Sequence, residues 1–140
     1  VYETAFKIFN DNKVMGIGPK MFRKICDQDK YYTKSDIDRT IDGCQTHPHN
    51  TYIQLLSETG IVGTIFILIL FFHFLYFLFS QLLNRFRSNS YTNHSLICLY
   101  GCFFITLWPL IPTGNFFHNW LNIIYFLPIG FAINIYGKNQ

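Results

Sequence analysis

The chain has 140 residues, of which 50% are hydrophobic and 19% aromatic, while only 14% are charged. A soluble domain carries about 25% charged residues, so this composition excludes a single soluble globule, a disordered chain and a nucleic-acid-binding protein. All eight acidic residues and eight of the eleven basic residues precede residue 60, so the net charge of +3 comes from Arg85, Arg87 and Lys138. The charge distribution therefore indicates membrane topology and not a polyanion-binding patch.

The polar sequence at the start of the chain predicts short helices joined by turns. Residues 2–9 (YETAFKIF) have a helical pattern, which a polar Asn-Asp-Asn run interrupts. The sequence GIGP at residues 16–19 predicts a turn, and residues 21–25 predict a short helix. Residues 27–43 are polar and of mixed charge, as in a solvated loop. A second helix is predicted to start near Pro48, because proline is well tolerated in a first helical turn.

Three apolar segments follow, and a bilayer-spanning helix needs about 20 mostly apolar residues. The predicted spans lie near residues 60–80, 95–112 and 118–136. The first of them is apolar on every side, as a lipid-surrounded helix should be. The sequence therefore predicts two regions, a loop region with short helices at residues 1–58 and a membrane region at residues 59–140.

Positive charges predict the orientation, because cytoplasmic loops carry an excess of Lys and Arg. The loop at residues 81–94 contains two arginines and no acid, and the C-terminal tail contains a lysine. Both are expected in the cytoplasm, whereas residues 1–58 and the turn at 113–117, flanked by Trp108 and Trp120, are expected outside. In a Gram-negative bacterium that side is the periplasm. The predicted fold is an all-α, polytopic integral membrane protein with three transmembrane helices and a periplasmic helical loop.

The densest group of polar candidates is the run THPHNTY at residues 46–52. If a helix starts at Pro48 and continues into the membrane at 100° per residue, residues three or four positions apart lie on the same face of it. That face contains five residues: His49, Tyr52, Leu56, Gly60 and Gly63. The two glycines open it to a neighbouring helix or a lipid chain, and the helix N-terminus favours a neutral imidazole that acts as a base. From spacing alone, an interfacial, hydrogen-bonded histidine is the favoured interpretation.

The stretch HPHNTYIQLLSETGIVG at residues 47–63 resembles the signature of the O-antigen ligase and polymerase family, the Wzy C-terminal superfamily. GIGPKMFR at residues 16–23 resembles the family's earlier periplasmic glycine turn. Four glycines belong to these motifs: Gly16, Gly18, Gly60 and Gly63. The resemblance covers essentially the whole chain, but only the C-terminal part of a family member. The missing initial Met and targeting segment also favour a C-terminal fragment.

The resemblance implies metal-independent, inverting glycosyl transfer at the outer face of a bacterial inner membrane, without a cofactor. The expected donor is a glycan on undecaprenyl diphosphate. An O-antigen ligase transfers this glycan to lipid A-core, whereas an O-antigen polymerase joins it to another repeat unit. The residues leave that choice open, and membrane lipids are the other expected partners.

The family's chemistry needs a base for the incoming hydroxyl group and fixed cations for the diphosphate leaving group. The resemblance implies the first role for His49. Arg23 is the best local candidate for the second, because a guanidinium binds phosphate bidentately, and Lys20 and Arg39 are weaker candidates. Two neighbours of the histidine are also assigned to substrate binding: Asn50 and Tyr52.

Two competing interpretations carry less weight. His47 and His49 could chelate a metal, but no further ligands recur at a recognised spacing, so no metal site is predicted. From another class, the chain could belong to a transporter of a lipid-linked sugar. A transporter would place paired ionisable residues or broken helices at mid-membrane, where this sequence has only His73, so the enzyme is favoured.

Cys26 and Cys44 are predicted to form a disulfide, because both lie in the segment assigned to an oxidising compartment. They bracket the polar loop at residues 27–43. Closing a loop of that size contributes roughly 3 kcal/mol by chain entropy. The bond would also hold Arg23 near His49.

Overall fold

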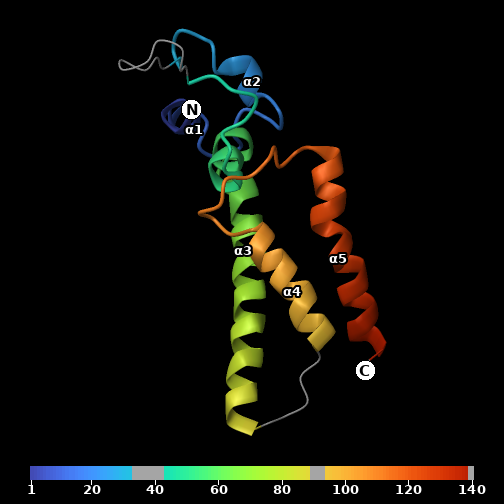
Figure 1. Cartoon of the computed structure of the whole chain (residues 1–140). Coiled ribbons are helices and arrows are strands. Elements are labelled where there is room, and N and C mark those ends of the chain that lie inside the picture. Colours follow the sequence, from blue (N-terminus) through green and yellow to red (C-terminus); the bar gives the residue numbers. More distant parts are fainter. Residues whose placement is uncertain (33–42, 89–93, 139–140) are drawn as a thin grey trace. The chain divides into compact units, whose positions relative to one another are not determined.

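The computed structural model describes residues 1–32, 43–88 and 94–138, and every regular element in these ranges is an α-helix (Figure 1). The helices are α1 (Tyr2–Asp11), α2 (Phe22–Ile25), α3 (Thr51–Ser88), α4 (His94–Thr106) and α5 (Asn119–Lys138). The described part of the chain therefore confirms the all-α prediction. It forms two compact units, of which the first contains residues 1–67 and 109–121 and the second contains residues 68–108 and 122–140.

The first unit has a small apolar core under α1. One face of this helix buries Ala5 and Ile8, which pack with Phe22 of α2, Cys26 and Tyr31. The opposite face is exposed, and it carries an i,i+4 ion pair between Glu3 and Lys7 as well as the ring of Phe6. The helix ends at the polar Asn-Asp-Asn run, two residues beyond the predicted 2–9. The amphipathic pattern of α1 thus positions the glycine turn that follows it.

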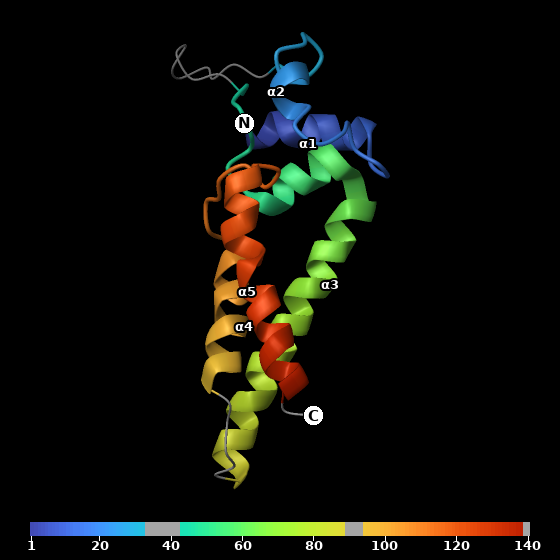
Figure 2. The same cartoon turned by 90° about the vertical axis from the view of Figure 1, so that its right-hand side faces the viewer.

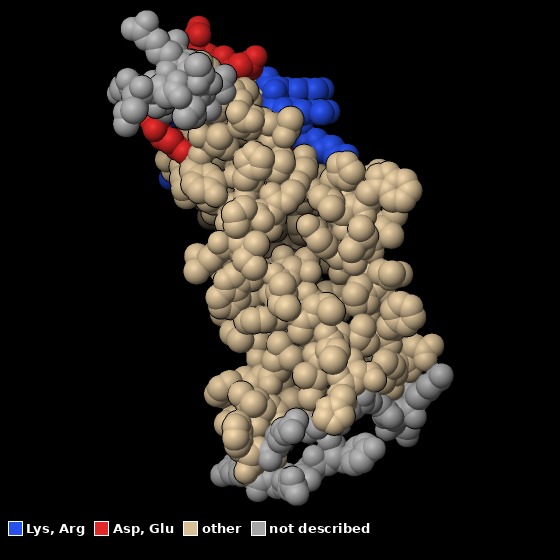
Figure 3. Space-filling view, in the orientation of Figure 1, with Lys and Arg blue, Asp and Glu red and all other residues tan. Residues whose placement is uncertain are grey.

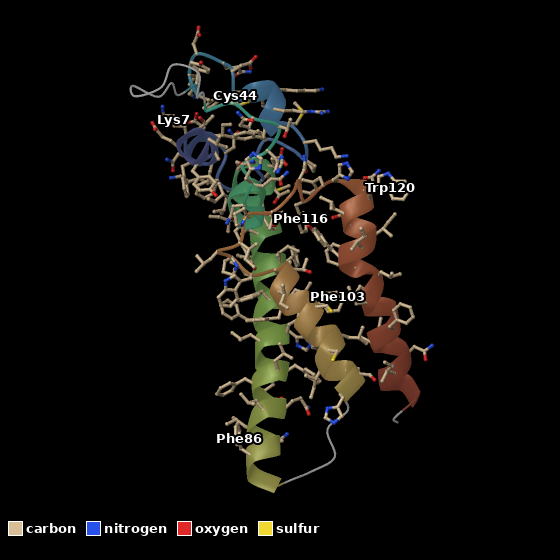
Figure 4. The ribbon with its side chains drawn as sticks, in the orientation of Figure 1. Lys7, Cys44, Phe86, Phe103, Phe116 and Trp120 are labelled. Atoms are coloured by element: carbon tan, nitrogen blue, oxygen red, sulfur yellow. A yellow bond between two sulfur atoms is a disulfide. The ribbon has the colours of Figure 1, made fainter. Side chains whose placement is uncertain are left out.

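The disulfide that the sequence predicts is present in the structure, where Cys26 at the end of α2 is bonded to Cys44 (Figure 4). Their Cα atoms are 5.0 Å apart, within the range that a disulfide allows. An ion pair of 2.6 Å between Lys30 and Asp11 also joins the segment after α2 to the end of α1. Arg39 lies outside the described residues.

Helix α3 is broken at Gly60, whose φ of 66° and ψ of −163° are not helical. We call residues 51–59 its first half and residues 61–88 its second half; Figure 2 shows the bend near the N-terminal end of α3. The prediction that the helix starts near Pro48 is wrong, because the helix begins at Thr51 and Pro48 lies buried before it. The prediction of a continuous helix into the apolar stretch is also wrong at Gly60.

The second unit is held by aromatic side chains of α3 and α4. The rings of Phe74 and Phe103 stack with centroids 4.7 Å apart, and those of Phe77 and Tyr100 with centroids 3.9 Å apart. An apolar pocket of about 710 Å³ lies in this unit, and α5 contributes Ala132 to its lining. The pocket is also lined by two polar-tipped residues: His73 and Tyr100.

One helix among the described residues is long and apolar enough to cross a membrane, the part of α3 from Thr51 to Asn84. The predicted span 95–112 is longer than the helix found there, since α4 ends at Thr106 and has 13 residues, or about 20 Å. Pro109 explains the early end, because a proline disfavours helical geometry in the residue before it. The apolar part of α5 is also short, from Asn119 to Ile135. Three spans therefore remain a prediction.

Candidate functional site

The glycine turn docks its backbone on the broken end of the first half of α3. The amide of Ile17 donates to the carbonyl oxygen of Ser57 at 3.1 Å, and the amide of Gly18 donates to that of Glu58 at 2.8 Å. A helix leaves its last carbonyl groups without partners, and the turn supplies two. Gly16 makes the approach possible, because its φ is 65° and a Cβ atom there would overlap the Glu58 backbone.

The second half of α3 returns the same kind of contact. Its first amides would lack partners, but Ile61 donates to the carbonyl oxygen of Lys13 at 2.8 Å and Val62 to that of Val14 at 3.3 Å. A Cβ atom on Gly60 would overlap the carbonyl group of Val14. The prediction that Gly60 opens a helix face to a neighbour is therefore wrong. Gly60 instead lets the loop cap both sides of the break.

A buried carboxylate beside the break joins three segments of the first unit. Glu58 is 1% exposed, and its Oε1 accepts the amide of Phe22 at 2.9 Å. Its Oε2 accepts from Nε2 of Gln54, which also donates to Oδ1 of Asn115; both distances are 2.9 Å. Oε1 of Gln54 then accepts the amide of Phe116 at 2.9 Å. We call this set the Glu58–Gln54 network, and it ties α2 and residues 115–116 to the first half of α3.

Asn50 is the N-cap of α3. Its Oδ1 accepts the amides of Tyr52 at 3.0 Å and Ile53 at 3.2 Å, which satisfies two of the unpaired donors at the helix start. Its Nδ2 donates to the carbonyl oxygen of Pro109 at 2.7 Å. All these contacts are internal, so the structure gives Asn50 a structural role, and its place beside substrate stays a prediction. Tyr52 is half-buried in the first turn of the helix.

His49 lies just before the cap, in the left-handed region with a φ of 56°. Non-glycine residues seldom occupy this region, and such strain clusters at functional sites. The side chain is exposed, and the backbone carbonyl oxygen accepts the amide of Thr113 at 2.9 Å. The predicted helix face shared with Tyr52 and Gly60 is wrong, because His49 precedes the helix and Gly60 interrupts it.

His47 has both ring nitrogens engaged in hydrogen bonds. Nε2 lies 3.2 Å from the carbonyl oxygen of Thr113, which can only accept, so this nitrogen carries the proton; Nδ1 lies 3.0 Å from the hydroxyl of Thr46. Burial lowers the pKa of His47; the bond to Thr113 opposes that shift, and the His49 ring, with its centroid 4.3 Å away, adds to it. A neutral His47 therefore helps to hold the segment around Thr113, together with a hydroxyl contact from Thr51.

The cationic candidates lie on and beside α2, where Figure 3 shows Lys and Arg side chains gathered. Arg23 is exposed and directly follows Phe22, whose amide is fixed by Glu58. Lys20 is also exposed, and its φ of 62° places it in the left-handed region. Within the described ranges, no group of three or more His, Cys, Asp or Glu side chains is placed to hold a metal ion.

Sequence reasoning missed the Glu58–Gln54 network as a functional support. The sequence-based predictions give Glu58 no role. One signal was available, since Glu58 is the last acidic residue before a long uncharged stretch. A charged side chain at that point needs partners, and the structure supplies two donors. The remaining members of the network are distant in sequence, so their pairing carried no local signal.

Comparison with protein families identifies one match, to the family described as O-antigen ligase, over residues 1–68. The matched range contains the glycine turn, α2, the histidine motif and the break in α3. Comparisons with curated proteins and with solved structures gave no match.

Proposed function

Because residues 1–68 belong to the O-antigen ligase family, we propose that this chain is part of an O-antigen ligase that transfers a glycan from undecaprenyl diphosphate to lipid A-core. The family implies a glycosyltransferase-like enzyme that works on lipid-linked glycans in a membrane. The observation that carries the finer proposal is the exposed, strained His49 at the start of α3. His49 lies within the range that matches the family, residues 1–68.

His49 acts as the base for the acceptor hydroxyl group. Its ring has no hydrogen-bond partner within the described part of the chain, whereas both nitrogens of His47 are engaged. As the hydroxyl oxygen attacks the anomeric carbon, its proton passes to the His49 imidazole. The bond from that carbon to the diphosphate oxygen breaks, and its electron pair leaves with the diphosphate. Attack opposite the leaving group inverts the anomeric centre, and no metal or cofactor takes part.

Arg23 binds the diphosphate leaving group. The structure supports this role through its neighbour Phe22, which packs in the core with Ile53 and donates its amide to Glu58. Helix α2 is therefore fixed against the first half of α3. This half is about 10 Å long from its first turn to Glu58. A fixed guanidinium stabilises developing negative charge better than a mobile one, because no reorganisation is needed during the reaction. Lys20, Asn50 and Tyr52 complete the substrate-binding set.

The reaction takes place at the periplasmic face of a bacterial inner membrane. The histidine motif and the turn at residues 113–117 contact each other through Thr113, which supports a location of both on one side of the bilayer. The second half of α3 contains Arg85 and Arg87 near its C-terminal end, because the helix continues to Ser88 into the predicted loop, and their charges favour the cytoplasm. A polymerase would use the same groups with a repeat unit as acceptor. The acceptor that receives the glycan distinguishes a ligase from a polymerase.

The first test measures transfer of lipid-linked glycan in membranes, with lipid A-core and with a repeat unit offered separately. His49→Ala should abolish transfer to lipid A-core while the protein still inserts. Arg23→Ala should lose on the order of 3 kcal/mol in the barrier, about 100-fold in rate, and Arg23→Lys should lose less. Lys24→Ala is the matched control, because Lys24 is an exposed neighbour on α2 with no assigned role.

Full activity of the His49→Ala protein would refute the role of His49 as the base. Transfer only to the repeat unit would favour a polymerase over a ligase. Loss of activity with a chelator would contradict the metal-independent mechanism. The orientation has a separate test, in which a cysteine at position 88 is labelled in intact cells. Labelling should require a permeabilised inner membrane, and labelling from the periplasm would overturn the proposed active face.

A further inference from the structure

The loop between α1 and the glycine turn carries two apolar side chains at its tip. Val14 is 64% exposed and Met15 is 71% exposed. The loop is closed at its base, because the amide of Gly16 donates to the carbonyl oxygen of Asn12 at 2.9 Å. Single exposed apolar residues are common on protein surfaces, so the exposure alone identifies no partner. The position of the loop identifies the partner.

Two backbone hydrogen bonds fix this loop against the start of the second half of α3. Ile61 donates to Lys13 at 2.8 Å and Val62 donates to Val14 at 3.3 Å. These are the first residues after the break, and they begin the apolar run that is long enough to cross a membrane. The tip of the loop therefore lies at the level of the first turn of that run, not at the distant end of the polar unit.

The start of the second half of α3 exposes apolar side chains, as the tip of the loop does. Ile61 and Val62 are 43% and 42% exposed, and Ile65 and Phe66 in the next turn are also exposed. Val14 and Met15 add two further apolar side chains beside the first of these turns. Lys13, which precedes them, is exposed, and a long basic side chain at such a position extends its charge toward headgroup phosphates.

We propose that Val14 and Met15 insert into the lipid bilayer beside the first turn of the second half of α3. The partner is the lipid of the leaflet that faces the first unit, at the boundary between headgroups and acyl chains. Amphipathic segments of this kind bury their apolar side about 5–10 Å into that boundary. The inference requires a membrane location and does not depend on the proposed glycosyl transfer. The insertion fixes the depth of the glycine turn at the membrane surface.

The test places one environment-sensitive NBD fluorophore on a cysteine introduced at Met15. The free cysteines Cys98 and Cys102 are first replaced by serine, and the bonded pair Cys26–Cys44 is retained. The protein is reconstituted in vesicles of phosphatidylethanolamine and phosphatidylglycerol that contain nitroxide-labelled lipid. Asp29→Cys supplies an aqueous reference on the same unit, and Phe66→Cys supplies a lipid-exposed reference within the apolar run.

The label at Met15 should emit at shorter wavelength than the label at Asp29. Nitroxides near the headgroup should quench it more strongly than nitroxides deep in the acyl chains, and the label at Phe66 should show the opposite preference. Emission equal to that at Asp29, with full quenching by aqueous iodide, would overturn the proposal. A blue-shifted label that no lipid nitroxide quenches would overturn it too, because protein would then cover the loop.

A label at Val14 repeats the measurement independently of Met15. Both side chains are exposed, so their replacement removes little packing. Folding of each labelled protein is checked by hydrogen-exchange protection of the Ile17 and Gly18 amides, which are bonded to the first half of α3. A folded Val14-labelled protein with an aqueous spectrum would count against insertion as directly as the Met15 result.

Discussion

The two halves of α3 differ in the side chains that they bury and in those that they expose. The first half buries polar residues: Thr51, Gln54, Ser57 and Glu58. The second half exposes large apolar residues, among them Phe66, Ile69, Phe72, Tyr76 and Phe79. Hydrogen bonds with fixed partners hold the first half in place, whereas the second has the all-round apolar surface of a helix surrounded by lipid. Burial of polar groups is favourable only where every group is paired, so the first half depends on specific contacts that the second half does not need.

Gly60→Ala should have the largest effect, because Gly60 separates the two halves. The new Cβ atom would overlap the Val14 carbonyl group, and the φ of 66° strains any side chain. The glycine turn should detach, with a loss of about 3 kcal/mol or more in the stability of its docked state. Hydrogen exchange of the Ile17 and Gly18 amides measures this directly. Gly101→Ala is the control, because a Cβ atom there meets nothing within 4 Å; equal protection in both variants would contradict the prediction.

Glu58→Ala should have the next largest effect, because it leaves two buried N–H groups without an acceptor: the amide of Phe22 and the N–H of Gln54 Nε2 that does not bond Asn115. Each unpaired donor costs about 1–3 kcal/mol, so the first unit should lose roughly 2–6 kcal/mol of stability. Glu58→Gln keeps one acceptor for Phe22 and should lose less. The free energies of unfolding are measured by denaturant titration, with hydrogen exchange of the α1 and α2 amides as the readout. Glu3→Gln, at an exposed ion pair, should change little, and a similar loss there would contradict the network.

Asn50→Ala should remove the helix cap and cost about 1–2 kcal/mol. Asn50→Asp keeps the capping oxygen but loses the Nδ2 donor to Pro109. The difference between the two variants therefore separates capping from the docking of the segment at Pro109. Thermal unfolding measures the first contribution, and exchange of the Thr113 amide measures the second. If Asn50→Asp behaves like Asn50→Ala in both measurements, the cap carries no separate stability.

The smallest expected effect is a pH dependence at His47. Its pKa is lowered in the folded protein by burial, so the undocked segment binds a proton more readily than the docked one. Docking should be constant above pH of about 6.5, the ordinary pKa of histidine, and should weaken as the pH falls below it. Exchange of the Thr113 amide against pH tests this. His47→Gln retains a donor for Thr113 and should remove the pH dependence; an unchanged profile would exclude His47 as the cause.

The sequence predicts local structure in this chain better than it predicts tertiary contacts. The amphipathic pattern of α1 and its polar stop are local, and so is the apolar run of α3. The start of α3 was misplaced because Pro48 suggested a first turn, although Asn50 two residues later is a strong capping residue. The break at Gly60 needs the conformational freedom of glycine, but glycine alone does not predict it, since the stabilising partners, Lys13 and Val14, are remote in sequence. The histidine motif was found through its resemblance, but the support from Glu58 needed the structure.

The break in α3 also has a consequence for the order of assembly. Lys13 and Val14 are translated before Ile61 and Val62, so the loop leaves the ribosome before the helix that it caps. The N-terminal boundary of the apolar helix is therefore set by a loop that is synthesised before it, and not by hydrophobicity alone. Docking of the loop fixes where the helix stops being a straight rod.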